Sequence, residues 1–266
     1  MRKRKKTIDN VQNTAQPFHR LVPNMITICA LCTGLTSIQF AINERWEAAV
    51  IAIVIAAFLD AFDGAVARLL NAQSQLGAEL DSLSDFLCFG IAPALVLYLW
   101  TLQDIGRFGW MICLIFAVAG ALRLARFNAM SKEETAEANP LNGYFVGIPA
   151  PTGAGMTILP LILSFLVEDT DYASYAEFLR SPYFAGGWAL FFGAMMVSRV
   201  PTFSTKQLKL PPKMVVPLLA VFGLMVAGLI NAPWPTLSLM GVVYALSIPA
   251  AVIHYLIAKK KLTANA

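Results

Sequence analysis

Charged residues are scarce in this chain, and histidine and cysteine are scarcer still. Only 14% of the 266 residues are charged, whereas 58% are hydrophobic. This balance excludes an ordinary soluble protein and is typical of a protein that crosses a membrane several times. With two histidines, four cysteines and no second C-x-x-C to complement Cys29 and Cys32, a zinc or redox centre is not expected. We interpret the cysteines as small apolar residues of membrane helices.

Net positive charge is also small, at +4, and it gathers at the two ends of the chain. This distribution suits anionic lipid headgroups, and we assign no nucleic-acid role. Residues 1–20 form a basic cytoplasmic arm that either lies on lipid phosphates or only directs topology. We do not expect a cleavable secretory signal, because the first apolar run exceeds signal-peptide length and lacks a clear small-residue cleavage site.

Eight apolar segments have lengths near the ~20 residues that cross a bilayer. They lie at about 21–42, 47–70, 80–102, 108–127, 148–167, 183–199, 213–231 and 235–258. The sequence therefore predicts an all-α fold, a polytopic integral membrane helical bundle of about eight transmembrane helices. After the arm at 1–20 we expect a transmembrane core at 21–200, a cytoplasmic loop at 201–212, and two additional C-terminal helices with a basic tail at 213–266.

Lysine and arginine are distributed unequally across this arrangement. All of them except Arg45, Arg107 and Arg180 fall on the side of the N-terminus. Because cytoplasmic loops carry the excess of positive residues, that side is expected to be the cytoplasm. We therefore expect an inner-membrane protein with both termini cytoplasmic.

Four aspartates interrupt the apolar sequence. Asp60 and Asp63 are one turn apart near the end of the second span, and Asp81 and Asp85 are one turn apart at the start of the third. If the chain turns back between the pairs, the carboxylates face one another at the cytoplasmic side and repel unless a cation joins them. Oxygen ligands favour magnesium, manganese or calcium over zinc. Ionisable residues in membrane segments are functional by default.

Small residues and one arginine accompany the aspartates. Gly64 and Ala67 share the face of the first pair, and Gly77 lies one turn before the second. These small side chains leave space for a bulky ligand. Arg68 offers a fork of donors that suits a phosphate. Metal, phosphate and space together indicate a nucleotide diphosphate.

The complete spacing, D-x2-D-G-x2-A-R-x8-G-x3-D-x3-D, resembles the signature of the CDP-alcohol phosphotransferases. These integral membrane enzymes transfer a phosphatidyl-type group from a CDP-linked lipid to an alcohol. The resemblance implies a six-helix core, a divalent metal cofactor (two ions, Mg²⁺ or Mn²⁺) and the general base Asp85; we also expect a homodimer. The metal ligands would be Asp60, Asp63, Asp81 and Asp85. The CDP contacts would be Asp60, Gly64, Ala67, Arg68 and Gly77.

Four further stretches narrow the resemblance to bacterial members that use L-serine as the acceptor. They read LVPNMIT, DSLSDFLCFGIAPA, LRLARFN and YFVGIPAPTGAG. The implied substrates are CDP-diacylglycerol and L-serine, and the implied products are phosphatidylserine and CMP. Glycerol 3-phosphate, inositol, inositol phosphate and choline stay as alternative acceptors. An intramembrane prenyltransferase would have widely separated aspartate motifs, and a cation-coupled transporter would favour midplane carboxylates and an inverted repeat.

Residues outside the aspartate motif supply further candidates. Arg123 and Arg126, one turn apart at the end of the fourth span, either anchor the helix at the interface or bind anions, with one for the serine carboxylate and one for the lipid-linked phosphate. Asn24 and Thr27 either cap the first helix, which we favour, or contact the nucleotide. The glycines and prolines of residues 147–155 predict a broken or closely packed helix entrance.

Overall fold

The computed structural model describes residues 21–133, 144–167, 173–198, 200–203 and 214–264. The basic arm at 1–20 and most of the loop at 201–212 lie outside the described residues. The helices are α2 (Val22–Ile42), α3 (Trp46–Leu69), α4 (Gln75–Asp85), α5 (Ala92–Trp100), α6 (Arg107–Glu133), α7 (Ala150–Thr157), α8 (Leu159–Val167), α9 (Ala173–Arg180), α10 (Pro182–Val197), α11 (Val215–Asn231) and α12 (Pro233–Ala264). A π-helix, η2 (Phe86–Ile91), joins α4 to α5, and a 3-10 helix, η3 (Leu102–Ile105), follows α5.

The all-α membrane bundle predicted from composition is confirmed. Five helical segments in the described residues are long and apolar enough to cross a membrane, or six if the bent α7–α8 pair is one span. The shorter apolar helices α10 and α11 occupy two further predicted segments. The count of eight spans is therefore not confirmed and stays a prediction.

One small β-ladder was not predicted. Strand β1 (Tyr144–Val146) pairs antiparallel with β2 (Pro201–Phe203), with Val146 opposite Pro201. Strands of three residues are too short to show an alternating pattern in the sequence. The ladder ties the entrance of α7 to the segment after α10.

The third span begins earlier than its hydropathy predicts. Ser74 has an extended backbone, and its Oγ accepts a hydrogen bond of 3.0 Å from the backbone N–H of Gly77. This N-cap starts α4 at Gln75, whereas the apolar run starts at about residue 80. Asp81 therefore lies within α4 and Asp85 is its last residue.

The glycine- and proline-rich entrance at residues 147–155 has both predicted properties. Helices α7 and α8 are bent by 41° at their junction. Gly153 packs so closely on α10 that a Cβ there would lie 2.5 Å from the Sδ of Met196. Gly147 has a φ of +81°, a conformation that glycine adopts without strain.

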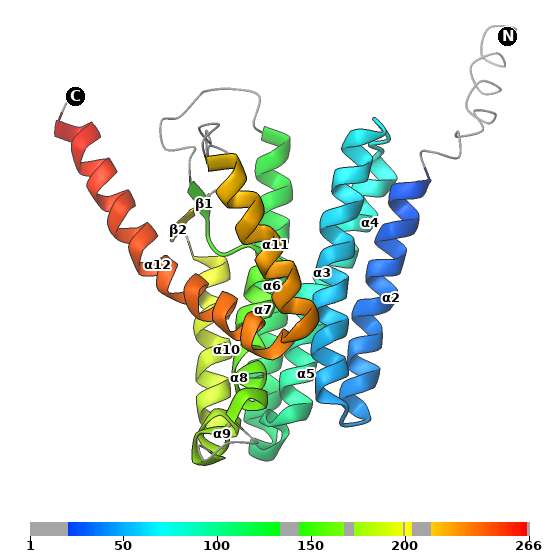
Figure 1. Ribbon diagram of the computed structural model, residues 1–266, viewed down its shortest axis with the longest axis vertical. Coiled ribbons are helices and arrows are strands. Elements are labelled where there is room, and N and C mark those ends of the chain that lie inside the picture. The colour runs from blue at the N-terminus through cyan, green and yellow to red at the C-terminus, as the bar shows by residue number, and fades with distance from the viewer. Residues whose placement is uncertain (1–20, 134–143, 168–172, 199, 204–213, 265–266) are drawn as a thin grey trace, which may run out of the picture.

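Helices α2 and α3 form an antiparallel hairpin with α4 beside its open end (Figure 1). The C-terminal ends of α6 and α12 lie at the same end of the bundle (Figure 1). At the opposite end lie the α2–α3 turn with Arg45 and helix α9, which ends at Arg180. The aspartates and these two arginines are thus at different ends of the bundle, as the charge distribution predicted.

Candidate active site

Helices α3 and α4 bring three of the four aspartates together. Asp60, Asp63 and Asp81 each offer a carboxylate oxygen, and these oxygens lie within 4.8 Å of one another. Asp63 is buried and Asp60 is half-buried. In the part of the chain that the structure describes, no other cluster of His, Cys, Asp or Glu could hold a metal ion. Three convergent carboxylates are a donor set that fits Mg²⁺ or Mn²⁺.

Helix α2 completes the surroundings of Asp63 through Thr27. The Thr27 hydroxyl lies 2.5 Å from Asp63 Oδ2, to which it donates, and 3.1 Å from the carbonyl oxygen of Pro23. Both Thr27 and Asp63 are buried, at 4% and 3% exposure. A hydrogen bond to a buried carboxylate fixes the orientation of that carboxylate.

The prediction that Asn24 or Thr27 caps α2 is wrong. The N-cap of α2 is Leu21, and no side chain makes a capping hydrogen bond there. Pro23 in the first turn already lacks an N–H group, so fewer amides need a cap. Asn24 instead lies against α4, where its Oδ1 would be 2.8 Å from a Cβ built on Gly77.

The third span is held against α2 by a series of close contacts below the aspartates. Ser84 Oγ donates to the Thr27 carbonyl at 3.5 Å, and Cys88 Sγ donates to the Ala30 carbonyl at 3.4 Å. Gly34 packs directly on Cys88, since a Cβ there would lie 2.4 Å from the sulfur. These contacts fix the position of α4 and η2, and hence of Asp81, relative to Asp63.

Asp85 stands apart from the three-carboxylate group. Its side chain interacts with that of Asp60 and, electrostatically, with Arg123. Its Oδ1 is buried and has no hydrogen-bond partner among the described residues. Asp85 therefore links the three carboxylates to Arg123 on α6, and its Oδ1 can accept a hydrogen bond or a proton from a further group. It also directly precedes the π-helix η2, an element frequent at functional sites.

The two arginines of α6 have different surroundings. At Gly120 a Cβ would lie 3.2 Å from the Cα of Gly90, so α6 and η2 approach closely. Arg123 follows one turn later on α6 and interacts electrostatically with Asp85. The Arg123 Nε is buried without a partner among the described residues. Arg126 instead donates from Nη1 to the Val197 carbonyl at the end of α10, at 2.6 Å. The burial of its Nε favours the anion-binding interpretation of Arg123 over the interfacial anchor, and that interpretation stays a prediction.

Space is present on one side of Asp63. A Cβ built on Gly64 would meet only Arg68 Nη1, at 3.9 Å, so the guanidinium folds back over this open surface. Arg68 is exposed and Ala67 is half-buried. A glycine is needed at position 77 for a different reason, because the close approach of Asn24 leaves no room for a side chain. The assignment of Gly64, Ala67, Arg68 and Gly77 to a CDP site stays a prediction.

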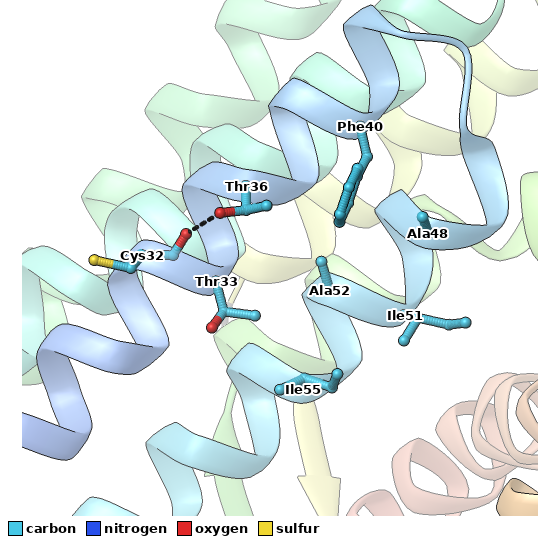
Figure 2. Close-up of a pocket in the computed structure, with 8 residues that line it drawn as sticks. All are labelled: Cys32, Thr33, Thr36, Phe40, Ala48, Ile51, Ala52 and Ile55. Carbon is cyan, nitrogen blue, oxygen red and sulfur yellow. Dashed lines mark hydrogen bonds between the residues drawn. The ribbon is translucent and has the colours of Figure 1, made fainter.

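A groove of about 330 Å³ between α2 and α3 is separate from this site (Figure 2). It is lined by Cys32, Thr33, Thr36, Phe40, Ala48, Ile51, Ala52 and Ile55. Thr33 and Thr36 donate to backbone carbonyls of their own helix, at 2.7 Å and 2.6 Å. The groove carries no charged side chain and offers no acid–base chemistry. Cys32 lies there exposed and unpaired, as expected for an apolar residue of a membrane helix.

Sequence reasoning missed one polar residue of this site. Tyr244 of α12 interacts electrostatically with Arg123, and its hydroxyl is buried without a partner among the described residues. Its signal in the sequence is slight, a tyrosine in an apolar helix. The pairing with Arg123 depends on how α12 packs.

The chain thus gathers three carboxylates from two helices of a membrane bundle, a donor set that fits a divalent cation. The family model described as CDP-alcohol phosphatidyltransferase matches residues 20–196, and a second one, CDP-alcohol phosphatidyltransferase 2, matches residues 213–249. The chain therefore belongs to the CDP-alcohol phosphatidyltransferase family. This membership leaves the prenyltransferase and transporter alternatives without support.

Curated relatives from several bacteria carry one name, CDP-diacylglycerol–serine O-phosphatidyltransferase. A relative from Mycobacterium bovis is 37% identical over 233 residues, which cover 88% of this chain and 78% of the relative. A relative from Helicobacter pylori is 33% identical over 71% of this chain and 74% of its own length. One from Bacillus subtilis is 39% identical over 54% of this chain and 75% of its own length.

Proposed function

We propose that this protein transfers the phosphatidyl group of CDP-diacylglycerol to the hydroxyl of L-serine, giving phosphatidylserine and CMP. The observation that carries the proposal is the group formed by Asp60, Asp63 and Asp81, with Asp85 and Arg123 beside it. The names of the relatives support CDP-diacylglycerol and serine as the two substrates.

We infer that the three carboxylates hold a divalent cation, Mg²⁺ or Mn²⁺, and that Asp85 takes part in holding a second ion. When bound, such ions neutralise the charge of the pyrophosphate and of the CMP leaving group. Thr27 contributes by keeping one oxygen of Asp63 hydrogen-bonded and so fixing how its carboxylate points.

The remaining residues bind and orient the substrates. Gly64 and Ala67 leave space for CDP beside the carboxylates, Gly77 contacts CDP near the start of α4, and Arg68 pairs with a phosphate oxygen. Asp85 accepts the proton of the serine hydroxyl while the serine oxygen forms a bond to the β-phosphorus. The bond from that phosphorus to CMP breaks at the same time, on the opposite side of the phosphorus. A serine hydroxyl is too weakly acidic to ionise unaided near neutral pH, so a placed base is needed.

The membrane arrangement follows from the same assignment. We propose that the end of the bundle with the aspartates faces the cytoplasm and that the protein lies in a bacterial inner membrane, because lysine and arginine concentrate on that side. Residues 21–200 would form the catalytic core and 213–266 an addition to it. The homodimer is a prediction that the mass of the detergent-solubilised protein checks.

One assay tests the proposal and its alternatives. Purified protein receives CDP-diacylglycerol, Mg²⁺ or Mn²⁺, and one candidate alcohol at a time, and CMP release is measured. We expect rapid release with L-serine and little with glycerol 3-phosphate, inositol, inositol phosphate or choline. Rapid release with another alcohol and none with serine would replace the acceptor and keep the chemistry. No release with any of them contradicts the proposal.

A further inference from the structure

Three buried polar atoms without hydrogen-bond partners among the described residues belong to Arg123 and to two residues that interact with it, each on a different helix. They are Asp85 Oδ1, Arg123 Nε and the Tyr244 hydroxyl. Arg123 interacts electrostatically with both of the other residues. An unpaired polar atom in a buried position is costly, and native proteins contain few. Three such atoms on residues that interact electrostatically through Arg123 indicate atoms that a ligand satisfies.

The position of Tyr244 is set by the packing of α12 on the bundle. Gly241 approaches α8 so closely that a Cβ would lie 2.5 Å from Leu159 Cδ1. Ser238, Ile248 and Ala251 are buried on the same stripe of α12. The Tyr244 side chain packs against the buried apolar cluster that includes Phe89 and Met156. The ring of Tyr244 is therefore held by packing, while its hydroxyl is buried and the residue interacts electrostatically with Arg123.

The three atoms differ in hydrogen-bonding character. Arg123 Nε and the Tyr244 hydroxyl are donors, whereas Asp85 Oδ1 is an acceptor. A hydroxy-amino acid has the complementary pattern, with a carboxylate that needs donors and a hydroxyl that gives up a proton. A carboxylate taken into such a buried place requires a positive partner. Arg126 is less suited, because Nη1 is engaged with the Val197 carbonyl.

We propose that the Tyr244 hydroxyl and the Arg123 guanidinium bind the carboxylate of the acceptor serine, so that α12 supplies a specificity-determining residue. This inference rests on the proposed function, since it names the acceptor subsite of the same reaction. It gives the C-terminal helices a direct role, beyond that of a scaffold, in choosing the alcohol.

The test is Tyr244→Phe, which removes the hydroxyl and keeps the ring. A hydrogen bond to a charged group is worth about 1.5–3 kcal/mol, so the KM for serine should rise about 10- to 100-fold. The KM for CDP-diacylglycerol should change less than about twofold, since no bond to the lipid is lost. The matched control is Tyr98→Phe on α5, whose ring packs on Trp110 at 5.3 Å. We expect its KM values and thermal stability to be those of the wild type.

A second variant and a second acceptor sharpen the result. Arg123→Lys keeps the charge and loses the planar fork, so it should also raise the KM for serine. In the double variant the effects should be less than multiplicative, because both side chains bind one carboxylate. L-Serinamide lacks the negative carboxylate, and the preference of the enzyme for serine over serinamide should fall in both single variants.

Each other outcome overturns the inference. A rise in the KM for CDP-diacylglycerol alone would assign Tyr244 to the lipid-linked phosphate. Unchanged kinetics, or a loss of thermal stability with both KM values raised, would make Tyr244 a packing residue. A wild-type protein that releases no CMP with serine would instead contradict the proposed function itself, which separates the two failures.

Discussion

Replacing Thr27 with valine removes the hydroxyl that donates a hydrogen bond of 2.5 Å to Asp63 Oδ2, and it changes little else. Valine has nearly the same shape as threonine and is also β-branched, so α2 should keep its helical structure. The second contact of the hydroxyl, with the Pro23 carbonyl at 3.1 Å, lies within α2 and contributes little to the site. The variant therefore tests one interaction, the hydrogen bond between α2 and the carboxylate of α3.

The magnitude follows from the burial of both partners. Asp63 is only 3% exposed, so water does not replace the lost donor. A hydrogen bond to a charged group is worth about 1.5–3 kcal/mol, and each 1.4 kcal/mol corresponds to about a factor of ten in an equilibrium constant. If the bond holds Asp63 in the orientation that binds metal, the Mg²⁺ concentration for half-maximal activity should rise about 10- to 100-fold.

The assay is CMP release over a range of Mg²⁺ concentrations, together with direct titration of bound Mn²⁺ by electron paramagnetic resonance. The matched control is Thr36→Val on the same helix, which removes a bond of 2.6 Å to the Cys32 carbonyl in the groove of Figure 2. This control should bind metal as the wild type does. Equal metal affinities in Thr27→Val and the wild type would refute the reasoning, as would equal losses in both valine variants.

Three further predictions follow from the site and its supports. Removal of divalent metal with a chelator should abolish CMP release and added Mg²⁺ or Mn²⁺ should restore it; full activity after chelation contradicts a metal role for the aspartates. Gly77→Ala should destabilise the protein by about 1–3 kcal/mol in thermal unfolding, because its Cβ would lie 2.8 Å from Asn24 Oδ1, and an added Asn24→Ala should relieve the loss. Arg126→Ala should lower thermal stability by releasing the Val197 carbonyl, while the KM for serine stays within about twofold of the wild type; a large rise in that KM would assign Arg126 to the acceptor.

The sequence alone determined the membrane bundle and the neighbourhood of the aspartates. Long apolar runs have one stable form in a bilayer, the helix, so the all-α fold follows from hydropathy. The 3.6-residue period placed Asp60 with Asp63 and Asp81 with Asp85, and a turn in the short connection was expected to bring the two pairs together. These are local properties, and the distances among the carboxylates agree with them.

The tertiary structure decided which residues of different helices meet. Thr27 reaches Asp63 across 36 positions of the chain, and no local pattern distinguishes that contact from a helix cap. Arg123 and Arg126 are one turn apart in an apolar helix, yet Arg123 interacts electrostatically with Asp85 whereas Arg126 donates to the Val197 carbonyl. Such contacts depend on how far each helix rotates and how closely the backbones approach, which small residues such as Gly34, Gly120 and Gly241 fix through packing in three dimensions.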